Sequence, residues 1–143
     1  MKSKVKTVMK YDPHIISPEN TLKEAAQKMA SVGCGALPVA TQDNPMGMIT
    51  DRDIVIRAVA KGKDVNTEKV RDYMTSELFF CNADDSLEEA AEQMHRNHVS
   101  RLAVIDKHGK ITGMLSFGGI LRKHSDTREI ADITLCAVSK KAA

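Results

Sequence analysis

TLKEAAQKMASVGCGALPVA (residues 21–40) and SLEEAAEQMHRNHVSRLAVI (residues 86–105) are two copies of one pattern, and the second begins 65 residues after the first. Aligned without a gap, the copies share identities at Leu22, Glu24, Ala25, Ala26, Met29, Leu37 and Val39, which recur as Leu87, Glu89, Ala90, Ala91, Met94, Leu102 and Val104. Met9 and Met74 extend the match at the same spacing, and after one added residue Gly47 and Ile54 match Gly113 and Ile120. We infer an internal duplication in which each copy is one structural unit.

Each copy contains an amphipathic helix that starts at a capping box. Thr21 lies three residues before Glu24, and Ser86 lies three residues before Glu89, which is the signature of a helix start. After each cap, apolar residues follow at i, i+3, i+4 and i+7, while lysine, glutamate and glutamine occupy the opposite face. Both segments are therefore predicted to bury one alanine-rich face.

Short apolar runs around each helix predict strands. Two runs follow each helix and are joined by turn-forming residues, as in a hairpin; they are residues 36–40 with 46–50, and 102–106 with 111–116. One more strand is expected before each helix, at residues 14–16 and 79–81, and a second helix after each hairpin, at about 52–61 and 118–124. Each copy is therefore predicted to be a β-α-β-β-α unit.

Two such units account for most of the chain. The predicted boundaries are 1–62 for the first repeat, 63–124 for the second and 125–143 for a helical tail. A unit of this size with one apolar sheet face is marginal alone, so we expect an α/β fold in which the repeats pack sheet to sheet with pseudo-two-fold symmetry. Asp126 is a candidate N-cap of the tail helix, whose apolar side must meet the module or a second subunit; its apolar residues are Ile130, Ile133, Ala137 and Val138.

The composition argues against several classes of protein. The 143 residues are 42% hydrophobic, which is enough to form a hydrophobic core without disulfide bonds. The net charge of +2 favours neither nucleic acid nor a membrane surface as a partner. No apolar run has the length of a signal peptide or a membrane span. Cys34, Cys81 and Cys136 lack CxxC spacing, which favours free thiols over a disulfide framework. We therefore expect a cytoplasmic protein.

The duplicated unit resembles the CBS (cystathionine β-synthase) domain pair, or Bateman module. The likeness rests on GALPV at residues 35–39 and on GMITDRDIVIRAV at residues 47–59, and it covers about residues 7–124. Within the family, the chain most resembles standalone CBS-domain proteins of bacterial or archaeal type. The resemblance implies a non-catalytic regulator that binds an adenosyl ligand, such as AMP, ADP, ATP, NAD or S-adenosylmethionine, and requires no cofactor. It further implies a homodimer that acts in trans on an effector protein, which the sequence does not identify.

The resemblance also implies a ligand site in the first repeat, and the chemistry of the residues fits it. The hydroxyl of Thr50 can donate to a phosphate beside the unpaired N–H groups of a helix start. The carboxylate of Asp53 can accept hydrogen bonds from both ribose hydroxyls. Arg101 of the second repeat stands where family members extend a basic side chain to the phosphates. Adenine is expected in an apolar slot formed by His14, Ile15, Ile16, Gly35 and Met48.

The second repeat departs from the family pattern. Gly119 stands where the first repeat has Asp53, so the ribose carboxylate is missing. Losing a charge-assisted hydrogen bond costs about 1.5–3 kcal/mol. We therefore expect one good site per chain and a weaker second site, formed by Phe80, Ser100, Met114 and Ser116.

Other functions remain open at this point. An enzyme would have to use carboxylates that are commonplace at helix starts, namely Asp51, Asp53, Asp84 and Asp85. A metal site would need more partners than the pair His95 and His98, with His108 and His124 later in the same repeat. DNA binding lacks a recognition-helix pattern. The main alternative is a CBS pair that binds no ligand and serves protein interaction or a stress response.

Overall fold

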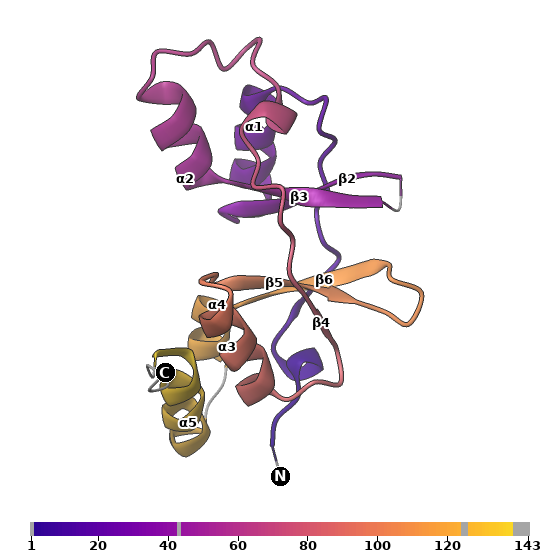
Figure 1. Cartoon of the computed structure of the whole chain (residues 1–143), viewed down its shortest axis with the longest axis vertical. Helices are drawn as coiled ribbons and strands as arrows, with labels where there is room; N and C mark the ends of the chain where they lie inside the picture. The colour runs from indigo at the N-terminus through magenta and orange to yellow at the C-terminus, as the bar shows by residue number, and fades with distance from the viewer. Residues whose placement is uncertain (1, 43, 124–125, 139–143) are drawn as a thin grey trace. The chain divides into compact units, whose positions relative to one another are not determined.

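The chain forms two compact units, which together give the predicted mixed α/β fold (Figure 1). The computed structural model describes residues 2–42, 44–123 and 126–138. The first unit consists of Pro13–Leu78, and the second of Met1–Asp12 together with Phe79–Ala143. No helix in the described ranges is long and apolar enough to cross a membrane.

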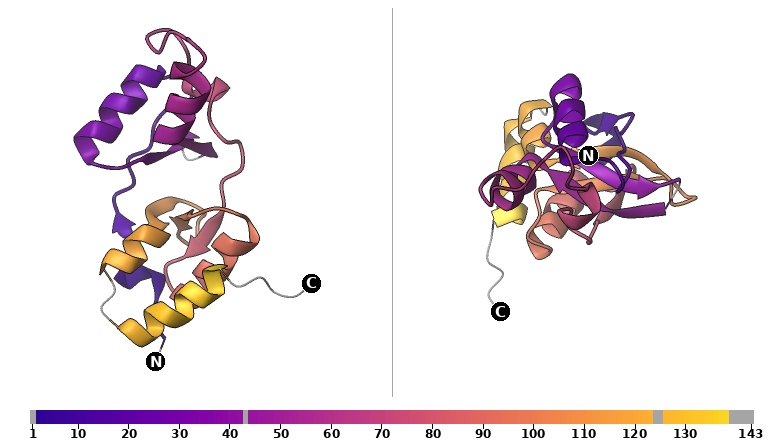
Figure 2. Two further views of the ribbon diagram at one scale, coloured as in Figure 1. Left: turned by 90° about the vertical axis from the view of Figure 1, so that its left-hand side faces the viewer. Right: turned by 90° about the horizontal axis from the view of Figure 1, so that it is seen from above.

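The first unit is a β-hairpin with two helices on one face (Figures 1 and 2). The hairpin pairs β2 with β3 in antiparallel register, so that Ala36 lies opposite Thr50. The elements are α1 (Leu22–Val32), β2 (Ala36–Thr41), β3 (Asn44–Thr50), α2 (Asp51–Asp53), a π-helical continuation at Ile54–Val59, and a 3-10 turn at Val70–Asp72.

The second unit repeats this plan with a complete four-stranded sheet in the order β1-β6-β5-β4. The strand β4 is parallel to β5, and the other two pairings are antiparallel. The elements are a 3-10 turn at Val5–Thr7, β1 (Lys10–Tyr11), β4 (Phe80–Asn82), α3 (Leu87–Arg96), β5 (Arg101–Ile105), β6 (Ile111–Ser116), α4 (Phe117–Lys123) and α5 (Thr127–Val138).

Each unit includes the N-terminal segment of the other predicted repeat. Lys10, within the first predicted repeat, pairs with Met114 of β6 in the second unit. Thr75, within the second predicted repeat, forms an isolated β-bridge with Met48 of β3 in the first unit. The packed units therefore differ from the sequence repeats, and the boundaries 1–62 and 63–124 remain a prediction of where the duplication lies.

The predicted capping boxes are confirmed. Thr21 and Glu24 cap α1 reciprocally, and Ser86 and Glu89 cap α3 in the same way. The tail helix is confirmed as well, because the carboxylate of Asp126 accepts hydrogen bonds from the first N–H groups of α5.

The strand predicted at residues 14–16 is wrong, and a proline explains why. Only Ile16 forms a β-bridge there, with Val39. In the second unit the N–H of Ala103 donates to the carbonyl of Phe79 at 2.9 Å, beside the parallel ladder of β4. The first repeat has Pro38 in the place of Ala103, and proline has no N–H to donate, so the ladder is cut short.

The helix predicted at residues 52–61 forms, but most of it is not α-helical. After Asp51–Asp53 the chain continues as a π-helix through Ile54–Val59, and the N–H of Ala60 donates to the carbonyl of Val55, five residues back. The predicted i, i+4 pairs then separate by environment. Ile54 and Ala58 are buried, whereas Val55 and Val59 are exposed.

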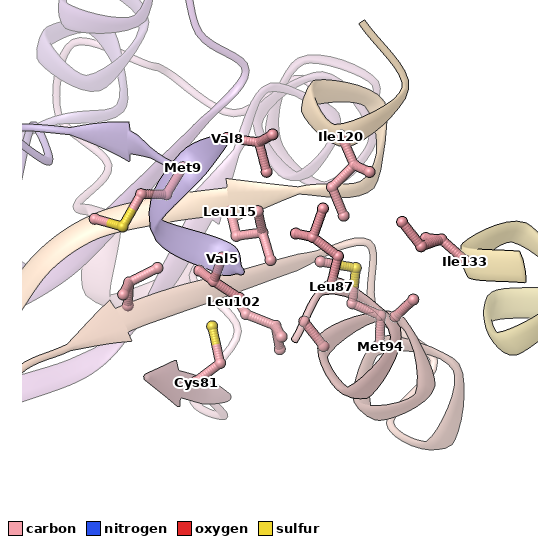
Figure 3. Close-up of a cluster of buried hydrophobic side chains, with 13 residues drawn as sticks. Val5, Val8, Met9, Cys81, Leu87, Met94, Leu102, Leu115, Ile120 and Ile133 are labelled. Carbon is pink, nitrogen blue, oxygen red and sulfur yellow. The ribbon is translucent and has the colours of Figure 1, made fainter. Parts of the chain in front are cut away.

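The core of the second unit includes the tail helix (Figure 3). Ile133 of α5 is fully buried in one cluster with Leu87 and Met94 of α3. The thiol of Cys81 lies in the same cluster, and burial raises its pKa to about 12. All three cysteines are free thiols, as predicted. The apolar side of the tail therefore packs on its own unit; Val138 has no described side chain.

Candidate functional site

The junction between β3 and α2 brings Thr50 and Asp53 together. Thr50 is the last residue of the strand and the N-cap of the helix. Its Oγ1 accepts a hydrogen bond from the N–H of Asp53 at 3.1 Å, and Oδ2 of Asp53 accepts one from the N–H of Thr50 at 3.0 Å. Both side chains are partly buried. The two residues predicted to hold phosphate and ribose thus form a third capping box.

Gly35 lies against this junction and leaves room for Asp51. The N–H of Asp51 donates to the carbonyl of Gly35 at 2.9 Å. A Cβ on Gly35 would come within 2.9 Å of Oδ2 of Asp51, so a side chain at this position would displace the carboxylate. The sequence analysis missed Asp51 as a neighbour of the predicted slot, because its pairing with Gly35 depends on the strand register.

The segment with His14, Ile15 and Ile16 is held by a bond that the sequence did not reveal. Nζ of Lys28, on α1, donates to the carbonyl of Ile15 at 2.7 Å. The second unit has the same arrangement, because Nε2 of Gln93 donates to the carbonyl of Phe80 at 2.7 Å. Since lysine and glutamine make equivalent bonds in the two units, this contact is part of the shared architecture.

The predicted lining residues differ in how accessible they are. His14 is exposed, Ile15 is half-buried and Ile16 is a buried core residue. Met48 is buried in β3, and its N–H and carbonyl bond to the backbone of Thr75. Because Ile16 and Met48 are engaged in the core and the sheet, a ligand could meet only the edges of these two residues.

The second unit preserves the junction without its carboxylate. Oγ of Ser116 accepts a hydrogen bond from the N–H of Gly119 at 2.9 Å, as Thr50 does from Asp53. The N–H of Phe117 donates to the carbonyl of Ser100, as that of Asp51 does to Gly35. The two predicted residues on the strands, Phe80 of β4 and Met114 of β6, both lie beside Ala103 of β5 in the sheet register.

Arg101 belongs to the second unit, where it opens β5 opposite Ser116 and is half-buried. Its predicted contact with a phosphate held at Thr50 of the first unit therefore stays a prediction. No group of three or more histidine, cysteine or acidic side chains within the described residues could hold a metal ion. His124 lies outside them.

Comparison with known proteins identifies the repeated unit. The sequence model of the CBS domain matches residues 5–59 and 70–126, that is, both repeats. The chain belongs to the CBS domain family. It is 36% identical over 118 residues to the CBS domain-containing protein YhcV of Bacillus subtilis, a match that covers 82% of this chain and 83% of YhcV.

Solved structures of CBS-domain proteins have the same fold. Hypoxic Response Protein I, whose crystal structure contains two coordinated zinc ions, is 31% identical, with a TM-score of 0.73 over 87% of this chain and all of that one. The CBS domain pair of protein MJ0100, in complex with 5'-methylthioadenosine and S-adenosyl-L-methionine, has a TM-score of 0.76 at 22% identity, over 85% of this chain and 95% of its own. At 22% identity, the similarity to the MJ0100 domain pair shows only that the two proteins share a fold.

Proposed function

We propose that this CBS pair is a regulatory module, and not an enzyme, that binds an adenosyl ligand at the Thr50–Asp53 junction of the first unit. The ligand would be AMP, ADP, ATP, NAD or S-adenosylmethionine. The module would act in trans, as a cytoplasmic homodimer, on a partner protein. The observation that carries the proposal is the junction itself, where the Thr50 hydroxyl and the Asp53 carboxylate lie together between the end of a strand and the start of a helix.

The capping box leaves both side chains able to bind a ligand. Oγ1 of Thr50 uses one lone pair for the cap, and its O–H remains available to donate to a phosphate oxygen. Asp53 uses Oδ2 for the cap, and a carboxylate has acceptor sites enough for a diol as well. Gly119 offers no such acceptor in the second unit, which supports one strong site per chain.

The family relationship supports the ligand class. The MJ0100 domain pair holds two adenosyl compounds on the same fold. The ligand itself must be found by experiment, because a nucleotide and S-adenosylmethionine share the adenosine moiety and differ only beyond it.

Isothermal titration calorimetry of the full chain against AMP, ADP, ATP, NAD and S-adenosylmethionine tests the proposal. We expect binding of about one ligand per chain by the wild-type protein. Asp53→Ala should weaken it at least about ten-fold, because the charge-assisted hydrogen bonds to the ribose are lost. Asp53→Asn keeps an acceptor for the cap, and its affinity should lie between those of the wild-type protein and Asp53→Ala.

A matched control separates ligand binding from helix capping. Glu24→Ala removes the partner of Thr21 in the capping box of α1, as Asp53→Ala does for Thr50, without touching the junction. It should lower stability and leave affinity unchanged. If no ligand binds the wild-type protein, the proposal fails, and the chain is an interaction module whose capping box is only structural.

A further inference from the structure

The helix start at the proposed site already uses the N–H groups that a phosphate would need. A helix begins with four N–H groups that have no partner within the helix, and these groups commonly bind anions. At α2 the N–H groups of Thr50 and Asp53 bond to each other's side chains, at 3.0 and 3.1 Å. The N–H of Asp51 donates to the carbonyl of Gly35 at 2.9 Å, and that of Arg52 donates to Oδ1 of Asp51 at 2.8 Å. The phosphate seat expected from the sequence is therefore occupied by the protein's own acceptors.

Two of these acceptors are carboxylates. Asp53 contributes Oδ2, and Asp51 contributes Oδ1. The other oxygen of Asp51 lies beside Gly35, only 2.9 Å from where a Cβ would stand. Because Gly35 is predicted to line the ligand slot, a negative charge borders that slot. Arg52 is the one basic residue of this helical turn, so the two carboxylates leave the turn with an excess of negative charge.

The second unit shows that the carboxylates are not needed to build the junction. Phe117 and Gly119 stand there in the places of Asp51 and Asp53. The junction still forms, because the N–H of Phe117 donates to the carbonyl of Ser100 at 2.9 Å. Since the shared architecture accepts uncharged residues at both positions, the charges of the first unit are free to act on a ligand.

We propose that the first unit selects an adenosyl compound that is uncharged or positively charged beyond the ribose, such as a sulfonium nucleoside, over one that carries phosphate. The inference rests on the proposed function, because it concerns the ligand of the same site. A phosphate at Thr50 would gain one hydroxyl donor and would lie among carboxylates that repel it. A sulfonium is attracted by the same carboxylates. Asp51 is the residue that determines this selectivity, since Asp53 is committed to the cap and the ribose.

Isothermal titration calorimetry of the full chain with adenosine, S-adenosylmethionine, AMP and ATP tests the selectivity, because these compounds share one nucleoside and differ in charge. We expect S-adenosylmethionine to bind at least about ten-fold tighter than AMP, and ATP to bind most weakly. Raising the salt concentration from about 20 to about 500 mM should tighten the binding of AMP and weaken that of S-adenosylmethionine, because ions screen repulsion and attraction alike.

Asp51→Asn removes the charge and keeps the oxygen that accepts the N–H of Arg52. It should raise the affinity for AMP at least about five-fold and leave the affinity for adenosine unchanged. Asp72→Asn is the matched control, because it removes an exposed carboxylate of the same unit outside this helix start, and it should change neither affinity. Thermal unfolding of both variants checks that they fold.

The possible results separate this inference from the proposed function. If AMP or ATP binds the wild-type protein as tightly as S-adenosylmethionine does, the selectivity is overturned and the proposed function stands. The same holds if Asp51→Asn keeps the selectivity of the wild-type protein. If none of the four compounds binds, the proposed function fails, and this inference fails with it.

Discussion

His98 has a left-handed backbone conformation, with φ of +55°, at the end of α3. Its equivalent at the end of α1 is Gly33, with φ of +74°. Glycine adopts such angles freely, whereas other residues are strained by the contact of Cβ with the backbone. The two repeats therefore contain a matched pair of positions with the same geometry and different residues.

We expect His98→Gly to stabilise the protein by about 0.5–1 kcal/mol, and Gly33→Ala to destabilise it by about 1 kcal/mol. A Cβ on Gly33 would have no neighbour within 4 Å, so the loss would come from backbone strain alone. Urea unfolding measures both effects. His98→Ala is the control, because it removes the imidazole and keeps Cβ; if His98→Gly proves no more stable than His98→Ala, strain at this position is not the cause.

At the scale of elements, the difference between the edge strands of the two units depends on one N–H group. Ala103→Pro removes the N–H that donates to the carbonyl of Phe79 from the central strand β5. We expect a loss of about 1–3 kcal/mol, because the carbonyl of the partly buried Phe79 is left without its partner. Pro38→Ala supplies the missing donor in β2. The new amide hydrogen at position 38 should exchange slowly with deuterium. By comparison with the bond from Ala103 to Phe79 in the second unit, it should donate to the carbonyl of His14. Fast exchange of this new amide would contradict the explanation.

Local patterns in the sequence predicted most elements correctly. The capping boxes at Thr21 and Ser86, the two hairpins and the tail helix all follow from hydrogen-bonding side chains and apolar periodicity near each element. The π-helical turn at Ile54–Val59 could not be predicted from such local patterns. Over one or two turns, α- and π-helices bury nearly the same residues and differ in which carbonyl each N–H reaches. The missing strand at residues 14–16 depends on a proline more than twenty positions away in the chain.

The candidate site was predicted only where its contacts are local in the sequence. Thr50 and Asp53 are three residues apart, so their proximity follows from local structure. The bond from Lys28 to Ile15 and the crowding of Gly35 by Asp51 depend on how α1 and β2 pack, and no local pattern encodes that. The repeat would have been the useful signal, since Lys28 and Gln93 occupy equivalent positions and make the same contact.

For the whole molecule, the N-terminal segment of each repeat belongs to the packed unit of the other, and this decides which fragment can fold. The fragment of residues 13–78 contains a complete unit, whereas residues 1–62 correspond to the first sequence repeat and lack part of its core. The missing part includes Val70 and Tyr73, both buried against α1 and the hairpin. It also includes Glu68, whose carbonyl accepts a hydrogen bond from the N–H of Leu22, and Thr75, which pairs with Met48.

We therefore expect the fragment 13–78 to unfold cooperatively in urea and to give a dispersed amide NMR spectrum, although a unit of this size is only marginally stable. The fragment 1–62 should show neither property, because it loses two core side chains and the β-bridge of Thr75 to Met48, and the loss of the core side chains alone is large relative to the total stability. Equal cooperativity of the two fragments would contradict this view of the packed units. A fragment 13–78 that stays unfolded while the full chain folds would show that the first unit needs the second for its stability.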